Sequence, residues 1–98
     1  MGIHMVIELP DRRSVQTVIQ ALEAYKVRRR AGIARTKRRL ATFETHYRVD
    51  TARFLDEMTA EDLPGGDLEY VEWAGEAKLL EGLETELREL EHASYHMP

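Results

Sequence analysis

Residues 63–90, LPGGDLEYVEWAGEAKLLEGLETELREL, contain the turn and the amphipathic pattern that decide the fold. Leu63–Asp67 is the clearest turn in the chain, because proline and glycine favour turn conformations. Apolar residues at helical spacing follow, and they predict a long helix that is capped by Asp67 and runs to about Ala93. The expected apolar stripe, widened by Leu80, comprises Leu68, Val71, Leu79, Leu83, Leu87 and Leu90.

Two glycines, Gly75 and Gly82, lie inside this predicted helix. They are seven residues apart and therefore share a face, next to the expected stripe. Glycine in the middle of a helix lowers stability, so two of them on one face predict close packing against another helix.

A second long helix is predicted upstream of the turn. Its apolar positions recur at three- and four-residue spacing. They are Val15, Val18, Ile19, Leu22, Tyr25, Ile33, Leu40, Phe43 and Tyr47. We expect one helix, capped by Asp11 or Ser14, bent if anywhere at Gly32 and ending near His46. Two helices split at that glycine are the alternative.

The remaining segments are short. Asp50 is a suitable N-cap for a short middle helix that buries Phe54, Leu55 and Met58. Thr59 and Asp62 form a second expected cap. Residues 5–10 begin with a β-prone run and end at Pro10, so they are either a strand that pairs with a second copy or a partner, or an extended arm.

Composition favours one all-α domain over residues 1–98. Hydrophobic residues make up 43% of the chain and charged residues 33%, while aromatic residues make up only 7%. This mixture is typical of helical hairpins and coiled-coil-like oligomers. There is no cysteine, so disulfides and thiolate metal sites are excluded. A chain this small without such links often completes its burial in a second copy, and we expect a helical homo-oligomer.

Residues 1–4 resemble a cloning remnant, which makes Met5 the expected native start. The N-terminal residues do not form a signal-peptide pattern, and no apolar run reaches the roughly 18 residues that a membrane span requires. We therefore expect a cytoplasmic protein that does not enter a membrane.

The charges are divided unevenly along the chain. Residues 1–43 carry ten cations and three anions, a balance of +7, and the remaining 55 residues carry four cations and 15 anions, a balance of −11. Either the acidic C-terminal helix folds back on the basic helix, within a chain or between copies, or one half binds an external partner of opposite charge.

The basic stretch 26–39 is a candidate nucleic-acid site. Its expected phosphate contacts are Arg28, Arg29, Arg30, Arg35, Lys37, Arg38 and Arg39. It lacks interleaved aromatic residues, so base stacking is not indicated. A strand followed by helices also resembles ribbon-helix-helix repressors, although Arg30–Ile33 provides barely a turn between two helices.

Nothing in the sequence indicates an enzyme or a cofactor site. The carboxylates follow solvated helix faces, and there is no glycine-rich phosphate loop or nucleophile motif. His92 and His96 are four residues apart, but with no obvious third ligand they are expected to be an incidental pair and not a metal site.

Trp73 and Tyr70 belong to the aromatic residues that surround the central turn. Trp73 is expected either to fill the core or, if exposed, to anchor a bound protein.

The pattern from Phe43 onward carries a family resemblance. Its elements are Phe43-Glu44, Tyr47, Phe54-Leu55, Glu61-Asp62 through Asp67, Glu72-Trp73-Ala74 and Leu79 through Leu90. This pattern resembles the antitoxin halves of prokaryotic type II toxin–antitoxin pairs, including partners of TumE-type toxins. The resemblance implies that the acidic half neutralises a cognate toxin by covering its basic surface. The expected contact residues are Tyr70, Glu72, Trp73, Glu76, Leu80 and Leu83.

Overall fold

The computed structural model describes residues 2–95 and is all-α in that range. Helix α1 spans Arg12–Tyr47, helix α2 spans Thr51–Glu57, the 3-10 helix η1 spans Ala60–Asp62, and helix α3 spans Gly66–His92. The prediction of a long, a short and a second long helix is confirmed. Residues 5–10 form no strand and remain an extended arm.

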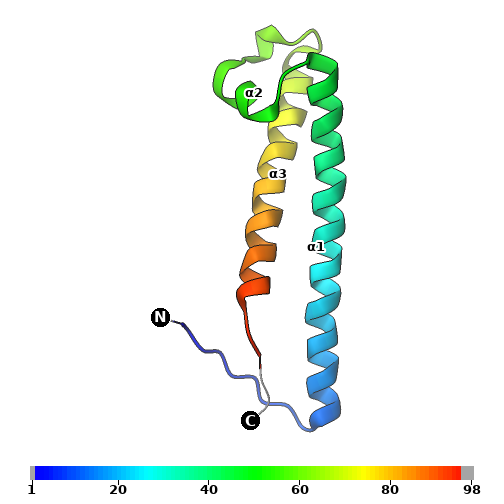
Figure 1. The fold of residues 1–98 in the computed structure, drawn as a ribbon, viewed down its shortest axis with the longest axis vertical. Coiled ribbons are helices and arrows are strands. Elements are labelled where there is room, and N and C mark those ends of the chain that lie inside the picture. The colour runs from blue at the N-terminus through cyan, green and yellow to red at the C-terminus, as the bar shows by residue number, and fades with distance from the viewer. Residues whose placement is uncertain (1, 96–98) are drawn as a thin grey trace.

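The two long helices form an antiparallel hairpin, and α2 with η1 covers the end where the chain turns (Figure 1). The molecule measures 59 × 27 × 18 Å, and its radius of gyration is 19.2 Å. A compact domain of this length has a radius of gyration of about 13 Å. The elongated shape leaves the outer side of each long helix in contact with solvent.

Helix α1 begins where the sequence provides a cap. The backbone amide of Ser14 donates a hydrogen bond of 2.8 Å to the carboxylate of Asp11, which satisfies a free amide of the first turn. The helix continues through Gly32 without interruption, so the prediction of a single helix is confirmed. It ends at Arg48, which adopts the left-handed conformation with φ 56° and lets its amide bond to the Glu44 carbonyl.

The caps of the middle segments also match the sequence. The carboxylate of Asp50 accepts a 2.8 Å hydrogen bond from the amide of Arg53, and Thr59 and Asp62 form a reciprocal capping box. The prediction that Asp67 caps α3 is wrong. The helix begins two residues earlier, with Gly65 at the cap position, because the two-glycine turn leads directly into it, and Asp67 lies in the first turn.

The core lies at the capped end of the hairpin. Its buried members are Leu40 of α1, Phe54 of α2, Leu63 and Trp73, and residues such as Phe43, Tyr47 and Tyr70 pack around them. Trp73 and Phe54 are 0% exposed. The aromatic core therefore lies where three helices meet. Along the rest of the hairpin, α1 and α3 contact each other in a single line of side chains, which we call the seam.

The seam uses a different face of α3 from the one predicted. Its inward residues recur at three- and four-residue spacing, as in a coiled coil. They are Trp73, Glu76, Ala77, Leu80, Leu83, Leu87 and Leu90, all buried or half-buried. Leu68, Val71 and Leu79, which the predicted stripe placed with these leucines, are 68%, 64% and 45% exposed on the outer side. The prediction of one stripe is wrong because α3 carries leucines on two faces, and only the face that includes Trp73 meets α1.

The two glycines of α3 do not support its packing against α1. A Cβ atom at Gly75 or Gly82 would meet nothing within 4 Å, so the predicted close approach to a helix does not occur among residues 2–95. Gly32 of α1 is the glycine in the seam, since its Cβ would lie 3.5 Å from a methyl group of Leu83.

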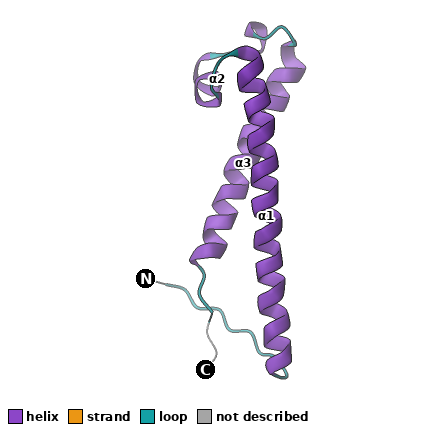
Figure 2. Ribbon diagram, turned by 45° about the vertical axis from the view of Figure 1, so that its right-hand side comes forward, coloured by secondary structure: helices purple, strands orange, loops and turns teal. Residues whose placement is uncertain are grey.

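Helix α1 extends beyond α3. The last described residue, Tyr95, hydrogen-bonds to Glu23, and the first turns of α1 below that point have no helix beside them (Figure 2). Val15, Val18, Ile19 and Leu22 in that part are half-buried, and the arm in front of them is exposed.

Candidate protein-binding surfaces

Trp73 belongs to the core and not to a surface. Its ring stacks on Phe54 with centroids 3.8 Å apart and planes 2° from parallel, and on Phe43 at 5.4 Å. Its indole nitrogen donates a 3.0 Å hydrogen bond to the hydroxyl of Thr51. Both faces of the ring are covered and its nitrogen is hydrogen-bonded, so Trp73 is not accessible to a partner. The expectation that Trp73 anchors a bound protein is therefore wrong, and Trp73 fills the core.

The other expected contact residues are spread over several surroundings. Leu83 is buried in the seam, and the ring of Tyr70 packs at a tilt of 55° against Phe54. Glu76 is half-buried, with its carboxylate 3.7 Å from the guanidinium of Arg39 of α1. Glu72 is exposed on α3, and Leu80 is half-buried in a groove described below. The six residues therefore do not form one patch, because Leu83 and Trp73 point into the hairpin.

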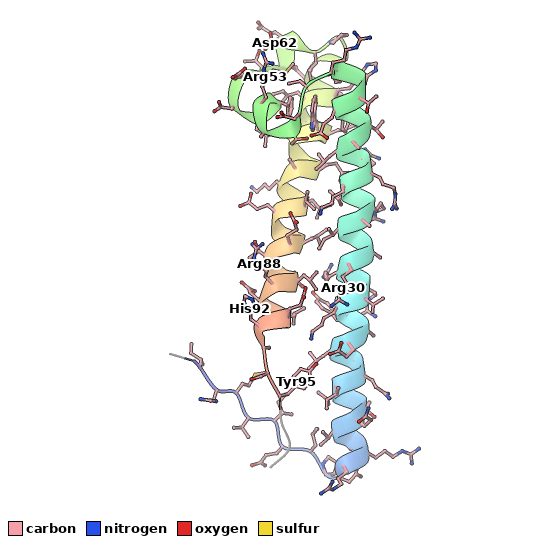
Figure 3. All side chains as sticks on the ribbon, viewed as in Figure 1. Arg30, Arg53, Asp62, Arg88, His92 and Tyr95 are labelled. Atoms are coloured by element: carbon pink, nitrogen blue, oxygen red, sulfur yellow. The ribbon has the colours of Figure 1, made fainter. Side chains whose placement is uncertain are left out.

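A different set of α3 residues, apolar and exposed, is a better candidate surface than the six predicted residues. Leu68, Val71 and Leu79 are exposed on α3 outside the seam with α1. Exposed carboxylates surround them: Asp67, Glu72, Glu81 and Glu89. We call this set the acidic face. Helix α3 carries nine carboxylates in total against two cations, Lys78 and Arg88. Lys78 is exposed and shares the side of Val71, seven residues earlier, and Arg88 also projects away from α1 (Figure 3). Leu68 and Val71 lie about one turn apart and Leu79 about two turns further along the helix, so we treat this row of aliphatic side chains as a candidate interaction surface.

The sequence contained this signal, but the pattern did not separate it from the core. Leu68, Val71 and Leu79 fall at helical spacing, and so do Leu83, Leu87 and Leu90. Only the packing of Trp73 against α2 fixes which set turns inward.

A groove with an apolar floor lies between the three helices. It has a volume of about 480 Å³, and Leu40, Leu55, Ala77 and Leu80 line it. Leu55, predicted to be buried, is 50% exposed here. Lys37 and Glu44 stand at its rim, and the carboxylate of Glu44 is already engaged by the amide of Thr51 at 2.7 Å. The groove is shallow and mixed in charge, so it is a weaker candidate than the acidic face.

The basic stretch divides into paired and unpaired cations. Arg29 contacts Glu86 at 3.1 Å, Lys37 contacts Glu84 at 3.9 Å, and Arg39 contacts Glu76. The acidic helix therefore does fold back on the basic one within the chain. Arg28, Arg30, Arg35 and Arg38 are exposed and form no ion pair within residues 2–95. Four of the seven predicted phosphate contacts thus remain open to an external partner.

Polar side chains occupy the seam at the open end of the hairpin. Tyr25 donates a hydrogen bond to Glu86 and accepts one of 2.6 Å from Arg29. Lys26 is buried to 8% exposure, with its ammonium 3.3 Å from Glu23. Loss of hydration lowers the pKa of Lys26, but hydrogen bonds to Glu23 and Tyr95 outweigh it and raise that pKa overall. Tyr95, and then Lys26, lower the pKa of Glu23 by hydrogen bonding.

The structure offers no metal site among the described residues, in which no three potential ligands converge. His92 projects from the end of α3 away from α1 (Figure 3), and His96 lies outside the described residues. Within residues 2–95, no helix is long and apolar enough to cross a membrane.

Comparison with protein-family models, with curated proteins and with solved structures found no match to this chain. The proposed function therefore rests on the residues of the two outer faces of the hairpin. One face is aliphatic and acidic, and the other is basic.

Proposed function

We propose that this chain is a non-enzymatic, cytoplasmic protein-binding hairpin that neutralises a small basic toxin with the acidic face of α3. The observation that carries the proposal is the exposure of Leu68, Val71 and Leu79 among carboxylates on one side of the helix. The antitoxin-like pattern from Phe43 onward supports the same role. The partner is therefore expected to be cationic, with an apolar recess for the aliphatic side chains.

Burial of the aliphatic side chains, complementary charge and a low ordering cost all favour specific binding of a partner at the acidic face. Full burial of an exposed aliphatic side chain contributes roughly 1.5–3 kcal/mol. Complementary charge around such a centre speeds the encounter and rejects acidic partners. The core at the other side of α3 fixes the helix, so little ordering is required on binding.

Co-expression with the product of the neighbouring gene tests the proposal. A mixed complex is expected by size exclusion with light scattering, and Leu79→Glu is expected to weaken it at least about tenfold, or about 1.4 kcal/mol. Leu55→Glu is a matched control, because Leu55 is similarly exposed but lies in the groove. Failure to form a complex, or a complex weakened by Leu55→Glu and not by Leu79→Glu, contradicts the proposal.

Nucleic-acid binding is the second candidate, favoured by the four exposed arginines of α1 without ion pairs. Fluorescence anisotropy with duplex DNA tests it. If three or four phosphates are neutralised, affinity should fall steeply between about 50 mM and about 200 mM salt. Arg35→Glu with Arg38→Glu should abolish the signal, whereas a flat salt response counts against this candidate.

A further inference from the structure

The outer faces of the two long helices carry opposite charge. The outer side of α1 presents Arg28, Arg35 and Arg38, and Val27, which is 60% exposed, lies with small residues between them. We call this the basic face. The acidic face of α3 lies on the opposite side of the hairpin, because each face points away from the other helix.

The hairpin does not neutralise these charges internally. The three ion pairs that join α1 to α3 use Arg29, Lys37 and Arg39, all of which flank the seam. The arginines of the basic face make none within residues 2–95, and the same holds for Glu72, Glu81 and Glu89. Each face therefore remains complementary to the other face of a second molecule.

The basic face is shorter than the acidic face. Arg28 and Arg38 are ten residues apart, about 15 Å of helix, so they match the stretch of the acidic face between Glu72 and Glu81, which are nine residues apart. Leu68, Val71 and Leu79 would supply the apolar centre on one side, and Val27 with the alanines at 31 and 34 would supply it on the other.

We propose that the acidic face of one copy packs against the basic face of a second copy of this chain. Because each copy uses two different faces, the contact is head-to-tail and gives a ring or an open chain of hairpins. Charge explains the choice of occupant: basic face against basic face, or acidic against acidic, places like charges together.

Self-association would regulate the binding site. The basic face of a neighbouring copy occupies the surface that a basic toxin needs, so the toxin must displace it. This competition rests on the proposed function, whereas the self-association itself does not.

The test uses two full-length variants that each lose one face. The first carries Arg28→Glu, Arg35→Glu and Arg38→Glu, and the second carries Glu72→Lys and Leu79→Lys. All five positions are exposed and outside the seam, so circular dichroism should show unchanged helicity. Light scattering at low ionic strength should show the wild type above the monomer mass and each variant alone as a monomer.

Mixing the two variants gives the decisive result. The first retains an intact acidic face and the second an intact basic face, so one contact can form and a 1:1 dimer is expected. Added salt should dissociate it. A wild type that stays monomeric at all concentrations, variants that keep the wild-type mass, or a mixture without dimer each overturn the inference.

The outcomes separate this inference from the proposed function. A monomeric wild type that still binds the neighbouring gene product overturns only the inference. An oligomer that ignores that product overturns only the antitoxin proposal. A monomer whose basic face instead binds duplex DNA assigns that face to nucleic acid and also overturns the inference.

Discussion

Trp73 joins three helices at the capped end of the hairpin. Its ring stacks between Phe54 of α2 and Phe43 of α1, and its nitrogen bonds to Thr51. Trp73→Ala should lower the free energy of unfolding by about 3–5 kcal/mol, because truncation of a buried aromatic leaves a cavity. Urea denaturation followed by circular dichroism measures this change.

Leu68→Ala provides the comparison for that measurement. Leu68 is 68% exposed on the same helix, so its truncation should change stability by less than about 0.5 kcal/mol. Equal effects of the two substitutions would mean that Trp73 is not in the core.

Thr36 is a buried polar residue whose hydroxyl lacks a partner among the described residues. It is 1% exposed in the seam. By contrast, the hydroxyl of Thr42 donates a 3.1 Å hydrogen bond to the carbonyl of Arg38, one turn back. Thr36→Val keeps the branched shape and removes the unsatisfied group, so it should raise stability by about 1 kcal/mol.

Thr42→Val is the matched variant, since Thr42 is exposed on the same helix. It should leave stability within about 0.5 kcal/mol of the wild type. A loss of stability in Thr36→Val would show that its hydroxyl is hydrogen-bonded in solution.

At the scale of elements, the start of α1 depends on an ionised cap. The hydrogen bond from the Ser14 amide, followed by that from its hydroxyl, lowers the pKa of Asp11 below the 3.8 of the unconstrained group. A carboxyl with a lowered pKa in the folded state stabilises the helix above pH 3.8 and loses that contribution as pH falls through the lowered value. The protection factor of the Ser14 amide, which corrects its exchange rate for the intrinsic dependence on pH, should therefore be constant near neutral pH and fall only in acid.

Asp11→Asn distinguishes this effect from general acid unfolding. Asparagine also caps helices but does not titrate in this range, so the acid-dependent step at Ser14 should disappear. An unchanged step in that variant would contradict the assignment of the titration to Asp11.

The sequence predicted the elements better than their faces. Caps such as Asp11, Asp50 and Thr59 are local signals, since side chain and amide lie three residues apart. Asp50 and Thr59 are caps as predicted, and Asp11 is one of the two predicted alternatives, the other being Ser14. The inward face of α3 is not local. Leu68 and Leu83 look equivalent in the sequence, and their separation into outer face and seam follows from the stacking of Trp73 on α2.

The sequence predicted the acidic character of the candidate site but not which residues are exposed there. The acidic half and its helical form were evident from the charge asymmetry, and Glu72 is exposed as expected. Trp73 and Leu83 were misplaced because buried and interfacial positions share the same apolar residue types. Arg29, Lys37 and Arg39 could not be separated from the outward arginines until the register of the hairpin was known.

At the scale of the whole molecule, stability is unevenly distributed. The capped end buries an aromatic core, whereas the open end closes on Lys26, Arg29 and Glu86. Local opening is favoured where buried apolar contacts are few. Amides over residues 86–92 of α3 should therefore exchange faster than those over residues 73–83 in a native-state hydrogen-exchange experiment, and uniform protection along α3 would contradict this gradient.

The central claim is that the acidic face of α3 is the surface that binds partners. Methyl NMR of leucine and valine tests it most directly, with spectra of the chain alone and with the neighbouring gene product added. The methyl groups of Leu68, Val71 and Leu79 should shift on binding, while those of Leu83 and Leu87 in the seam stay in place. Shifts confined to Leu55 and Leu80 would move the site to the groove and contradict the claim.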